Sequence, residues 1–262
     1  MPQASALLNV MIAAARKAAR SLARDFGEVE NLQVSRKGPS DFVSSADLKA
    51  EKTLFEELSK ARPGYGFVME ERGVVEGTDK TNRWLVDPLD GTTNFLHGIP
   101  HFAISIGLER EGILVAGVIY NVVRDELFWA EKGQGAYLND RRLRVAGRTD
   151  MREALFATGT PFHGKPGHEV FLAEVERVIA RTAGVRRFGS AALDLAYVAA
   201  GRFDGFWERG LNIWDVAAGA ILVREAGGVV NDIDGGDFLK TGAIVASNTA
   251  LTPQITQTLR GG

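Results

Sequence analysis

Residues 84–94, with the sequence WLVDPLDGTTN, constrain the fold of this chain more than any other segment. The apolar run 84–86 predicts the buried end of a β-strand. Pro88 is expected to end that strand and to hold Asp87 in extended backbone, because proline restricts the residue before it. Asp87 and Asp90 are therefore expected to leave the sheet at its rim, where two carboxylates can face a ligand.

A glycine and two threonines follow these carboxylates. Gly91 permits a tight turn, and the backbone amides after it face an anion if Thr92 or Thr93 opens a helix. Carboxylate oxygens are preferred ligands of hard divalent cations such as Mg²⁺. The segment therefore predicts a site at the end of a strand that holds a metal ion next to a phosphate group.

The composition is that of a globular domain. With 262 residues, of which 45% are apolar, the chain can bury a substantial core. We expect one domain over 1–262, with a metal-binding half at about 1–148 and a second α/β half at about 149–262. The formal net charge of -2 gives no general attraction for nucleic acid or an anionic membrane. The short basic clusters 141–144 and 186–187 are interpreted as solvated surface, so no direct nucleic-acid partner is expected.

Cysteine is absent, so any metal must take oxygen or imidazole ligands. The histidines have no tight ligand spacing, which disfavours a histidine-based metal site. Residues 5–26 carry apolar side chains at helical spacing, interrupted by basic residues, and predict an amphipathic packing helix. No apolar run reaches the roughly 18 to 20 residues that span a bilayer, and no export signal is evident, so we expect a cytoplasmic protein with no membrane partner.

The rest of the pattern predicts alternating helices and strands. A second helix is expected to open at Asp47, with Ser44 or Ser45 as its cap, and a short strand at 66–69 follows it. The polar interval 73–83 is interpreted as a loop. An antiparallel meander is expected over the segments 103–109, 114–120, 126–130 and 136–138. In the second half we expect strands near 154–158, 185–188, 205–207 and 243–246, and helices near 168–181, 190–200, 214–226 and 252–259.

Four acidic residues stand where these elements begin or end, namely Glu70, Asp87, Asp90 and Asp215. Mg²⁺ needs only a few carboxylates together with substrate phosphate and water, so this set fits one or two Mg²⁺ ions. Simpler explanations exist for two of them, because paired glutamates such as 70–71 are common on surfaces and Asp215 can cap the helix that it opens. The metal site therefore depends on the four residues converging. The glycine-rich segments lack the Rossmann and phosphate-loop patterns, so neither NAD nor ATP binding is supported.

Three blocks of the sequence resemble the inositol monophosphatase family. They are 41–47 with Glu51 downstream, 84–94 preceded by 70–71, and 214–219 continuing to 225–228. A further stretch, 189–197, resembles the bacterial branch, and the resemblance spans most of the chain. It implies a mixed α+β or α/β fold, the layered α-β-α-β-α sandwich of the inositol monophosphatase and fructose-1,6-bisphosphatase type.

The resemblance also implies a role for each residue of the site. A first Mg²⁺ ion would bind Glu70, Asp87 and the backbone carbonyl of Leu89. A second would bind Asp87, Asp90 and Asp215, and a third, weaker ion would share Glu70. The implied catalytic group is Asp47, Glu70 and Thr92, in which Thr92, paired with Asp47, orients the attacking water. The implied substrate-binding residues are Asp90, Gly91, Thr92, Gly189, Ser190, Ala191, Glu208 and Asp215, with the amides of Gly91 and Thr92 on the phosphate.

The implied function is Mg²⁺-dependent hydrolysis of inositol monophosphates and related sugar-alcohol phosphates by metal-activated water, with lithium sensitivity and a homodimer. Alternative substrates within the superfamily are histidinol phosphate, fructose 1,6-bisphosphate, 3'-phosphoadenosine 5'-phosphate and NADP, because the sequence is least decisive at the alcohol pocket. A non-enzymatic alternative is a partner of the transcription and RNA-processing machinery, in which some bacterial relatives act, with the region 186–187 as the contact surface.

Overall fold

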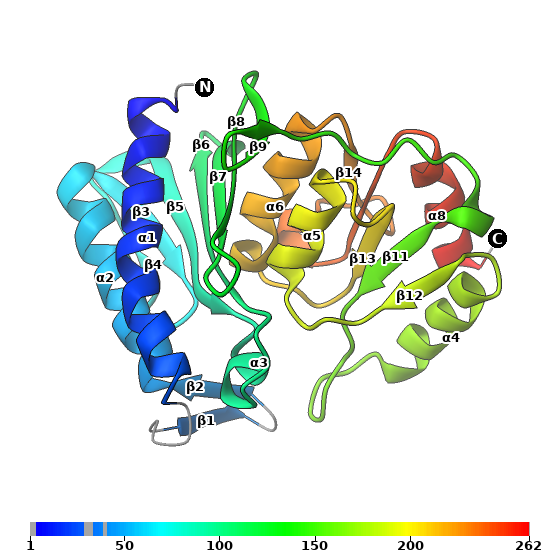
Figure 1. Ribbon diagram of the computed structural model, residues 1–262, viewed down its shortest axis with the longest axis horizontal. Helices are drawn as coiled ribbons and strands as arrows, with labels where there is room; N and C mark the ends of the chain where they lie inside the picture. The colour runs from blue at the N-terminus through cyan, green and yellow to red at the C-terminus, as the bar shows by residue number, and fades with distance from the viewer. Residues whose placement is uncertain (1–3, 29–33, 39–40, 262) are drawn as a thin grey trace.

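Helices and sheets alternate in five layers across the molecule, in the order helix, sheet, helix, sheet, helix (Figure 1). The computed structural model describes residues 4–28, 34–38 and 41–261. The first layer consists of α1 (Ala6–Phe26) and α2 (Ser45–Ala61), and the middle layer of α5 (Ala191–Ala199) and α6 (Ile213–Glu225). The predicted α-β-α-β-α sandwich is confirmed.

Both helices of the first layer begin at serine caps. Ser5 Oγ accepts a hydrogen bond from the amide of Leu8 at 3.2 Å, and Ser44 Oγ accepts one from the amide of Ala46 at 3.2 Å. The apolar face of α1, from Leu8 to Leu22, packs with the first sheet in one core, while the basic residues of the helix are exposed. The predicted amphipathic helix and the Ser44 cap are thus confirmed.

The first sheet has eight strands in the order β10-β9-β8-β7-β6-β5-β3-β4. Their bounds are β3 (Tyr65–Met69), β4 (Gly73–Val75), β5 (Asp79–Asp90), β6 (Ala103–Arg110), β7 (Ile113–Asn121), β8 (Glu126–Glu131), β9 (Gly135–Leu138) and β10 (Arg141–Arg142). Strands β6 to β9 form the predicted antiparallel meander, and β3 lies parallel to β5. A separate hairpin pairs β1 (Val34–Gly38) with β2 (Asp41–Ser44).

The prediction for the approach to the site was wrong in two places. The interval 73–83 is not a loop, because β4 pairs with β3 and β5 already begins at Asp79. The early part of β5 is mostly exposed and polar, so it lacks the apolar pattern by which strands are recognised. Pro88 does not end the strand either. β5 continues to Asp90, and Pro88 falls where the pairing with β6 is irregular, between Asp87 and Asp90, so its missing N–H is tolerated.

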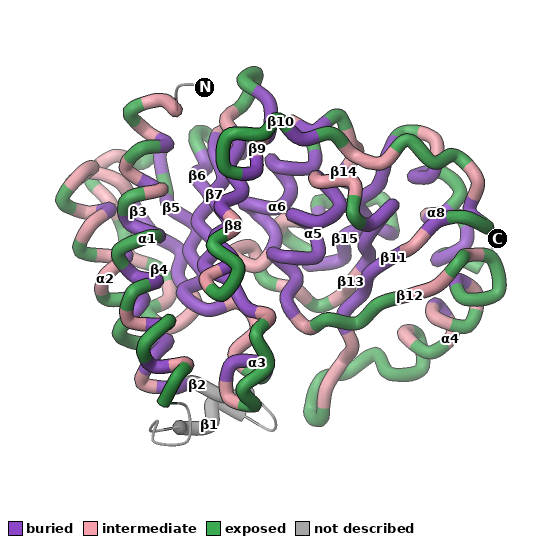
Figure 2. Tube along the Cα trace, in the orientation of Figure 1, coloured by how far each residue is buried: buried purple, intermediate pink, exposed green. Residues whose placement is uncertain are grey.

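Both sheets pack against α5 and α6, which are therefore buried on nearly every side (Figure 2). The second sheet has five strands in the order β12-β11-β13-β15-β14. Their bounds are β11 (Leu155–Thr158), β12 (Gly184–Arg186), β13 (Gly205–Glu208), β14 (Val229–Asp232) and β15 (Ile244–Ser247). The outer helices α4 (His168–Ile179) and α8 (Leu251–Arg260) cover its far face (Figure 1). These elements match the predicted positions except β14, which was missed together with the short helix α7 (Phe238–Thr241).

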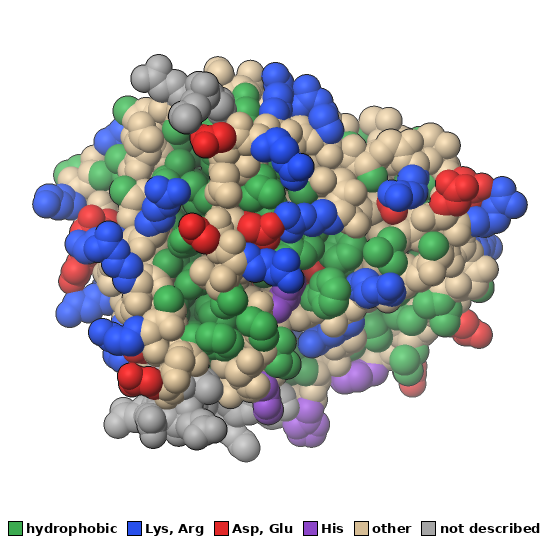
Figure 3. Space-filling view, in the orientation of Figure 1, with side chains coloured by type: hydrophobic (Ala, Val, Ile, Leu, Met, Phe, Trp, Pro, Cys, Tyr) green, Lys and Arg blue, Asp and Glu red, His purple; other side chains and the backbone are tan. Residues whose placement is uncertain are grey.

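Surface charge is mixed on the face shown in Figure 3, where basic and acidic side chains are interspersed. Of the predicted surface cluster, Arg141 and Arg142 form the exposed edge strand β10. Within residues 4–28, 34–38 and 41–261, no helix combines the length and apolar character needed to cross a membrane.

Candidate active site

The turn after Asp87 places two carboxylates at the edge of the first sheet. Asp87 is 2% exposed, and its Oδ1 accepts a hydrogen bond from the amide of Leu89 at 2.9 Å. Gly91 has φ of 96°, and a Cβ there would lie 3.1 Å from the carbonyl oxygen of His101, so this turn requires glycine. The helix α3 (Thr92–Leu96) begins directly after it, so Thr92 opens a helix as the sequence suggested.

Thr92 and Asp47 form a hydroxyl–carboxylate pair behind this turn. Thr92 Oγ1 lies 3.1 Å from Asp47 Oδ1 and 3.1 Å from the carbonyl oxygen of Leu89. Asp47 Oδ2 accepts hydrogen bonds from the Ser44 amide at 2.9 Å and from the Ser44 hydroxyl. Asp47 is fully buried, and this burial raises its pKa above the usual value. The pair therefore holds the threonine hydroxyl in one fixed position.

Asp90 connects the first sheet to α5. Its Oδ2 accepts hydrogen bonds from Ser190 Oγ at 2.5 Å and from the amide of Ala192 at 2.8 Å. A carboxylate at a helix N-terminus is favoured by the helix dipole. Asn94 adds a second link, because its side-chain amide donates to the carbonyl oxygen of Phe188 at 2.7 Å. The predicted substrate segment 189–191 is thereby fixed beside Asp90.

Asp215 and Glu208 reach the site from the other side. Asp215 Oδ2 accepts a hydrogen bond from the amide of Asn212 at 2.7 Å, so Asp215 does cap α6, but it also lines the cavity described below. Glu208 stands at the end of β13, against the backbone of Gly159. A Cβ on Gly159 would lie only 1.9 Å from Glu208 Oε1, so the carboxyl group occupies space that only glycine leaves open.

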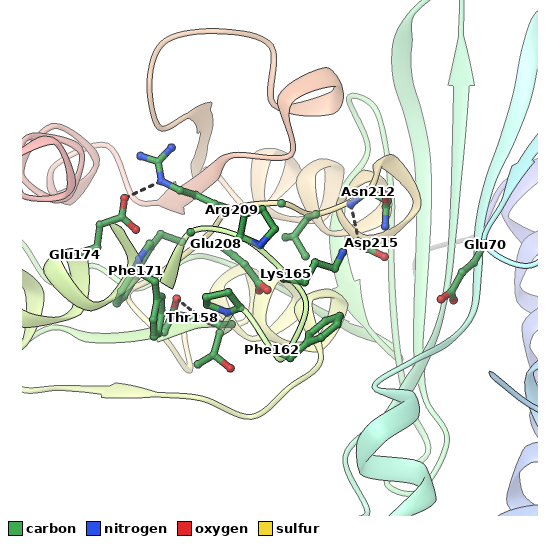
Figure 4. A pocket seen from close by; sticks show the side chains of 18 residues that line it. Glu70, Thr158, Phe162, Lys165, Phe171, Glu174, Glu208, Arg209, Asn212 and Asp215 are labelled. Carbon is green, nitrogen blue, oxygen red and sulfur yellow. Dashed lines mark hydrogen bonds and ion pairs between the residues drawn. The ribbon is translucent and has the colours of Figure 1, made fainter. Parts of the chain in front are cut away.

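Glu70 approaches from the end of β3. Its amide donates to the carbonyl oxygen of Val86 at 3.2 Å, which keeps it beside β5. The next amide, of Glu71, donates to Glu51 Oε2 at 2.8 Å, and Glu51 is itself buried in α2. Figure 4 shows Glu70 on one wall of the cleft, with Asp215 on the facing wall.

Two adjoining cavities contain these side chains. The first, of about 190 Å³, is lined by nearly every predicted site residue, namely Glu70, Asp87, Leu89, Asp90, Gly91, Thr92, Gly189, Ser190, Ala191, Glu208 and Asp215. Asp47 is not part of this lining, but its carboxyl group contacts Thr92, which is. The second cavity, of about 410 Å³, shares Glu70, Phe162, Glu208 and Asp215 with the first and extends to Lys165 and Phe171 (Figure 4).

The carboxyl groups in the first cavity repel one another. Burial and the charge of Glu70 raise the pKa of Asp87 well above its usual range. Burial is also the main reason why the pKa of Asp90 rises to about 6, that of Asp215 to about 8 and that of Glu208 to about 8. A divalent cation offsets such repulsion, and donors that are all oxygen suit a hard cation, so the residues fit a metal such as Mg²⁺. In the described part of the chain, no three acidic or histidine side chains already form a closed cation cage.

Several residues that line the cavities were not predicted from the sequence, among them Arg187, Lys165 and Asp194. Arg187 was interpreted as solvated surface; it is exposed, but it also lines the smaller cavity, so that interpretation was incomplete. Lys165 points toward Asp215 (Figure 4), and its charge opposes the rise that burial causes in the pKa of Asp215. Asp194 is buried in α5, and burial, followed by the charge of Glu208, raises its pKa well above the usual value. It is the only charged residue of an otherwise apolar helix, a signal that could have identified it.

Known proteins resemble this chain over almost its full length. The model of the inositol monophosphatase family matches residues 3–261. The chain is 65% identical to the inositol-1-monophosphatase of Mesorhizobium japonicum, over 94% of this chain and 93% of the relative. It is 44% identical to the Nus factor SuhB of Escherichia coli strain K12, over 97% of this chain and 96% of the relative. The crystal structure of extragenic suppressor protein suhB from Bartonella henselae matches with a TM-score of 0.96 and 58% identity, over 98% of this chain and all (100%) of that chain.

Proposed function

The chain belongs to the inositol monophosphatase family of phosphatases, whose members use metal ions, and we propose that it is a Mg²⁺-dependent hydrolase of inositol monophosphates and related sugar-alcohol phosphates. The observation that carries the proposal is the cavity in which Glu70, Asp87, Asp90 and Asp215 meet the residues of 189–191. Four carboxyl groups around one small space can accept a phosphate ester together with metal ions. Without the cations they would repel any anion.

We assign the metal-binding role to the oxygens of Glu70, Asp87, Leu89, Asp90 and Asp215. Two Mg²⁺ ions, with a third, weaker ion near Glu70, would lower the pKa of a water molecule and neutralise the charge of the phosphate. Thr92 would accept and orient that water, because its hydroxyl is fixed by Asp47 and by the carbonyl oxygen of Leu89. The amides of Gly91 and Thr92 would donate to the phosphate oxygens from the start of α3.

The alcohol would leave toward the second sheet. Gly189, Ser190 and Ala191 line that side of the cavity, and Glu208 offers a carboxyl group to the hydroxyl groups of a polyol. Hydrolysis of a phosphate monoester is among the slowest reactions in water, so the rate must come from charge and donors fixed around the phosphate. The hydrogen-bonded turn at 87–92 supplies such fixed groups.

A second candidate function applies in addition to catalysis. Because the E. coli relative is named as a Nus factor, we propose that this chain also contacts the transcription machinery, as a cytoplasmic homodimer. Recovery of RNA polymerase with both the unaltered protein and Asp87→Asn supports that role. Failure to recover it with either protein removes the role and leaves the phosphatase proposal intact.

The proposed activity is tested by phosphate release from inositol 1-phosphate, histidinol phosphate, fructose 1,6-bisphosphate, 3'-phosphoadenosine 5'-phosphate and NADP, with Mg²⁺ and with a chelator. We expect inositol 1-phosphate to be preferred, with no turnover after chelation and with inhibition by lithium. If another ester is preferred, the substrate assignment changes and the proposed metal-dependent mechanism stands. No turnover of any ester contradicts the proposal.

A further inference from the structure

Asp194 is a buried carboxyl group that makes no hydrogen bond to any residue that the structure describes. It is 1% exposed, and neither of its carboxyl oxygens has a partner among the described residues. Buried polar groups are almost always hydrogen-bonded, because leaving one unpaired destabilises the fold. In the described part of the chain, it is the one carboxyl group with both oxygens in this condition. A fold gains nothing from such a group, which indicates that it serves a ligand.

The other buried aspartates differ from it in this respect. Asp204, 2% exposed and in the same half of the molecule, accepts hydrogen bonds from Arg148 Nη1 at 3.2 Å and from the amide of Leu155 at 2.8 Å. Asp90, in β5, places its carboxyl group at the N-terminus of α5 and accepts hydrogen bonds there from Ser190 and Ala192. Asp194 follows in the first turn of the same helix, where the helix start is already satisfied. A structural role of the kind that Asp204 has is therefore excluded for Asp194.

The place of Asp194 identifies the ligand chemistry. It lines the same cavity of about 190 Å³ as Ser190 and Glu208, on the side assigned to the alcohol. Its charged neighbours are Glu208, Asp90 and Arg187, and Arg187 is an exposed side chain. A hydroxyl group both donates and accepts hydrogen bonds, so it can pair with a carboxyl group in either protonation state. A polyol hydroxyl therefore suits the position better than a second phosphate, which Asp194 and its two acidic neighbours would repel.

We infer that Asp194 is a specificity-determining residue that, together with Glu208, recognises the hydroxyl groups of the leaving alcohol. This inference rests on the proposed function, because it needs a polyol phosphate in the cavity. A hydroxyl, or a water that it holds in place, would bridge the two carboxyl groups and give Asp194 the partner that it lacks. Sites built to pair with a substrate hydroxyl reject analogues without it, since the buried polar group is then left unpaired.

The test compares Asp194→Leu with the matched control Asp204→Leu. For each protein, kcat/KM is measured with inositol 1-phosphate and with 4-nitrophenyl phosphate, whose leaving group carries no neighbouring hydroxyls, and the melting temperature is measured without substrate. For Asp194→Leu we expect the preference for inositol 1-phosphate to fall about tenfold. We expect its melting temperature to rise by about 2–4 °C, because an unpaired buried polar group is removed. Asp204→Leu should melt at a lower temperature and keep the preference.

Asp194→Ala repeats the measurement with a smaller side chain in case leucine does not fit. An unchanged preference in both Asp194 variants overturns the inference. So does a parallel loss of both activities with a lower melting temperature, since that is the result of a structural role. If the unaltered protein hydrolyses 4-nitrophenyl phosphate but no polyol phosphate, the proposed function itself fails, and it does so before any variant is compared.

Discussion

The two walls of the cleft are built differently. On the first-sheet wall, Asp47, Asp87, Asp90 and Thr92 each have fixed hydrogen-bond partners on neighbouring turns and helices. On the second-sheet wall, Asp194 has no hydrogen-bond partner among the residues that the structure describes, and Lys165 lies on an exposed loop, with its Nζ 5.3 Å from the ring centroid of Phe162. Preorganised groups suit a reaction centre that is the same for every ester, whereas incompletely paired groups suit the recognition of a variable alcohol. We propose from this difference that the two sheets divide the work, with the chemistry on the first and the selectivity on the second.

We expect the largest loss of activity from a change at Asp87, on the first-sheet wall. Asp87→Asn removes a buried carboxylate from the proposed metal site, and we expect the rate to fall about 10³-fold for every ester, with weaker Mg²⁺ binding. Steady-state rates over a range of Mg²⁺ concentrations and calorimetric titration measure both changes. Asp25→Asn is the control, because Asp25 is also buried but pairs with Lys49 at 3.0 Å outside the cleft. Full activity of Asp87→Asn at modest Mg²⁺ would contradict the assignment.

Thr92 should show the next largest effect. Thr92→Val keeps the shape of the side chain and removes the hydroxyl that Asp47 orients, so we expect kcat to fall about 10²-fold. The loss should be equal for polyol and aromatic phosphates, because the water attacks the same phosphorus atom in each. Thr92→Ser restores the hydroxyl and should recover most of the rate. Equal rates for Thr92→Val and Thr92→Ser would remove the proposed role.

A change at Lys165, on the second-sheet wall, should have a smaller effect than the changes at Asp87 and Thr92. Its positive charge faces Asp215 and opposes the binding of a cation there. For Lys165→Gln we therefore expect the Mg²⁺ concentration at half-maximal rate to fall about two- to threefold, a modest change because the side chain is exposed. High salt should abolish the difference by screening. A rise in the Mg²⁺ concentration at half-maximal rate would contradict the proposal that the Lys165 charge opposes cation binding.

The smallest effect is a pH dependence at the boundary between the walls. His101 packs on Phe188 and Tyr197, with ring centroids 5.2 and 6.0 Å apart, and burial lowers its pKa to about 4. Between pH 6.5 and 4 the unfolded chain binds a proton that the folded chain does not, so this contribution to stability falls as the pH drops through that window. The free energy of unfolding of His101→Phe minus that of the parent should therefore be larger at pH 5 than at pH 7.5. Denaturant unfolding at the two pH values measures this, and an equal difference at both values rules it out.

The sequence predicted what depends on local pattern. The buried segment 84–86 of β5, the turn at Gly91 and the serine cap of α2 are each determined by neighbouring residues, and the structure has them close to the expected positions. The fold class followed from the resemblance. The functional roles of the site residues remain predictions until the variants are measured.

What the sequence could not predict depends on contacts between distant segments or on exposed strands. Asp90 bonds to Ser190, a contact that spans 100 positions and that no local pattern encodes. The polar start of β5 was mistaken for a loop because its side chains face solvent. Asp194 carried a visible signal as a lone charge in an apolar helix, but only the fold shows that it lines the cavity and has no hydrogen-bond partner within the described part of the chain.

The separation of chemistry from selectivity is tested most directly by Asp87→Asn and Glu208→Gln, each assayed with inositol 1-phosphate and with 4-nitrophenyl phosphate. Asp87→Asn should lower both rates by the same factor. Glu208→Gln should lower kcat/KM about tenfold for inositol 1-phosphate and leave 4-nitrophenyl phosphate nearly unchanged, because it removes one contact to the alcohol. An equal loss on both substrates for Glu208→Gln, or a selective loss for Asp87→Asn, would contradict the account.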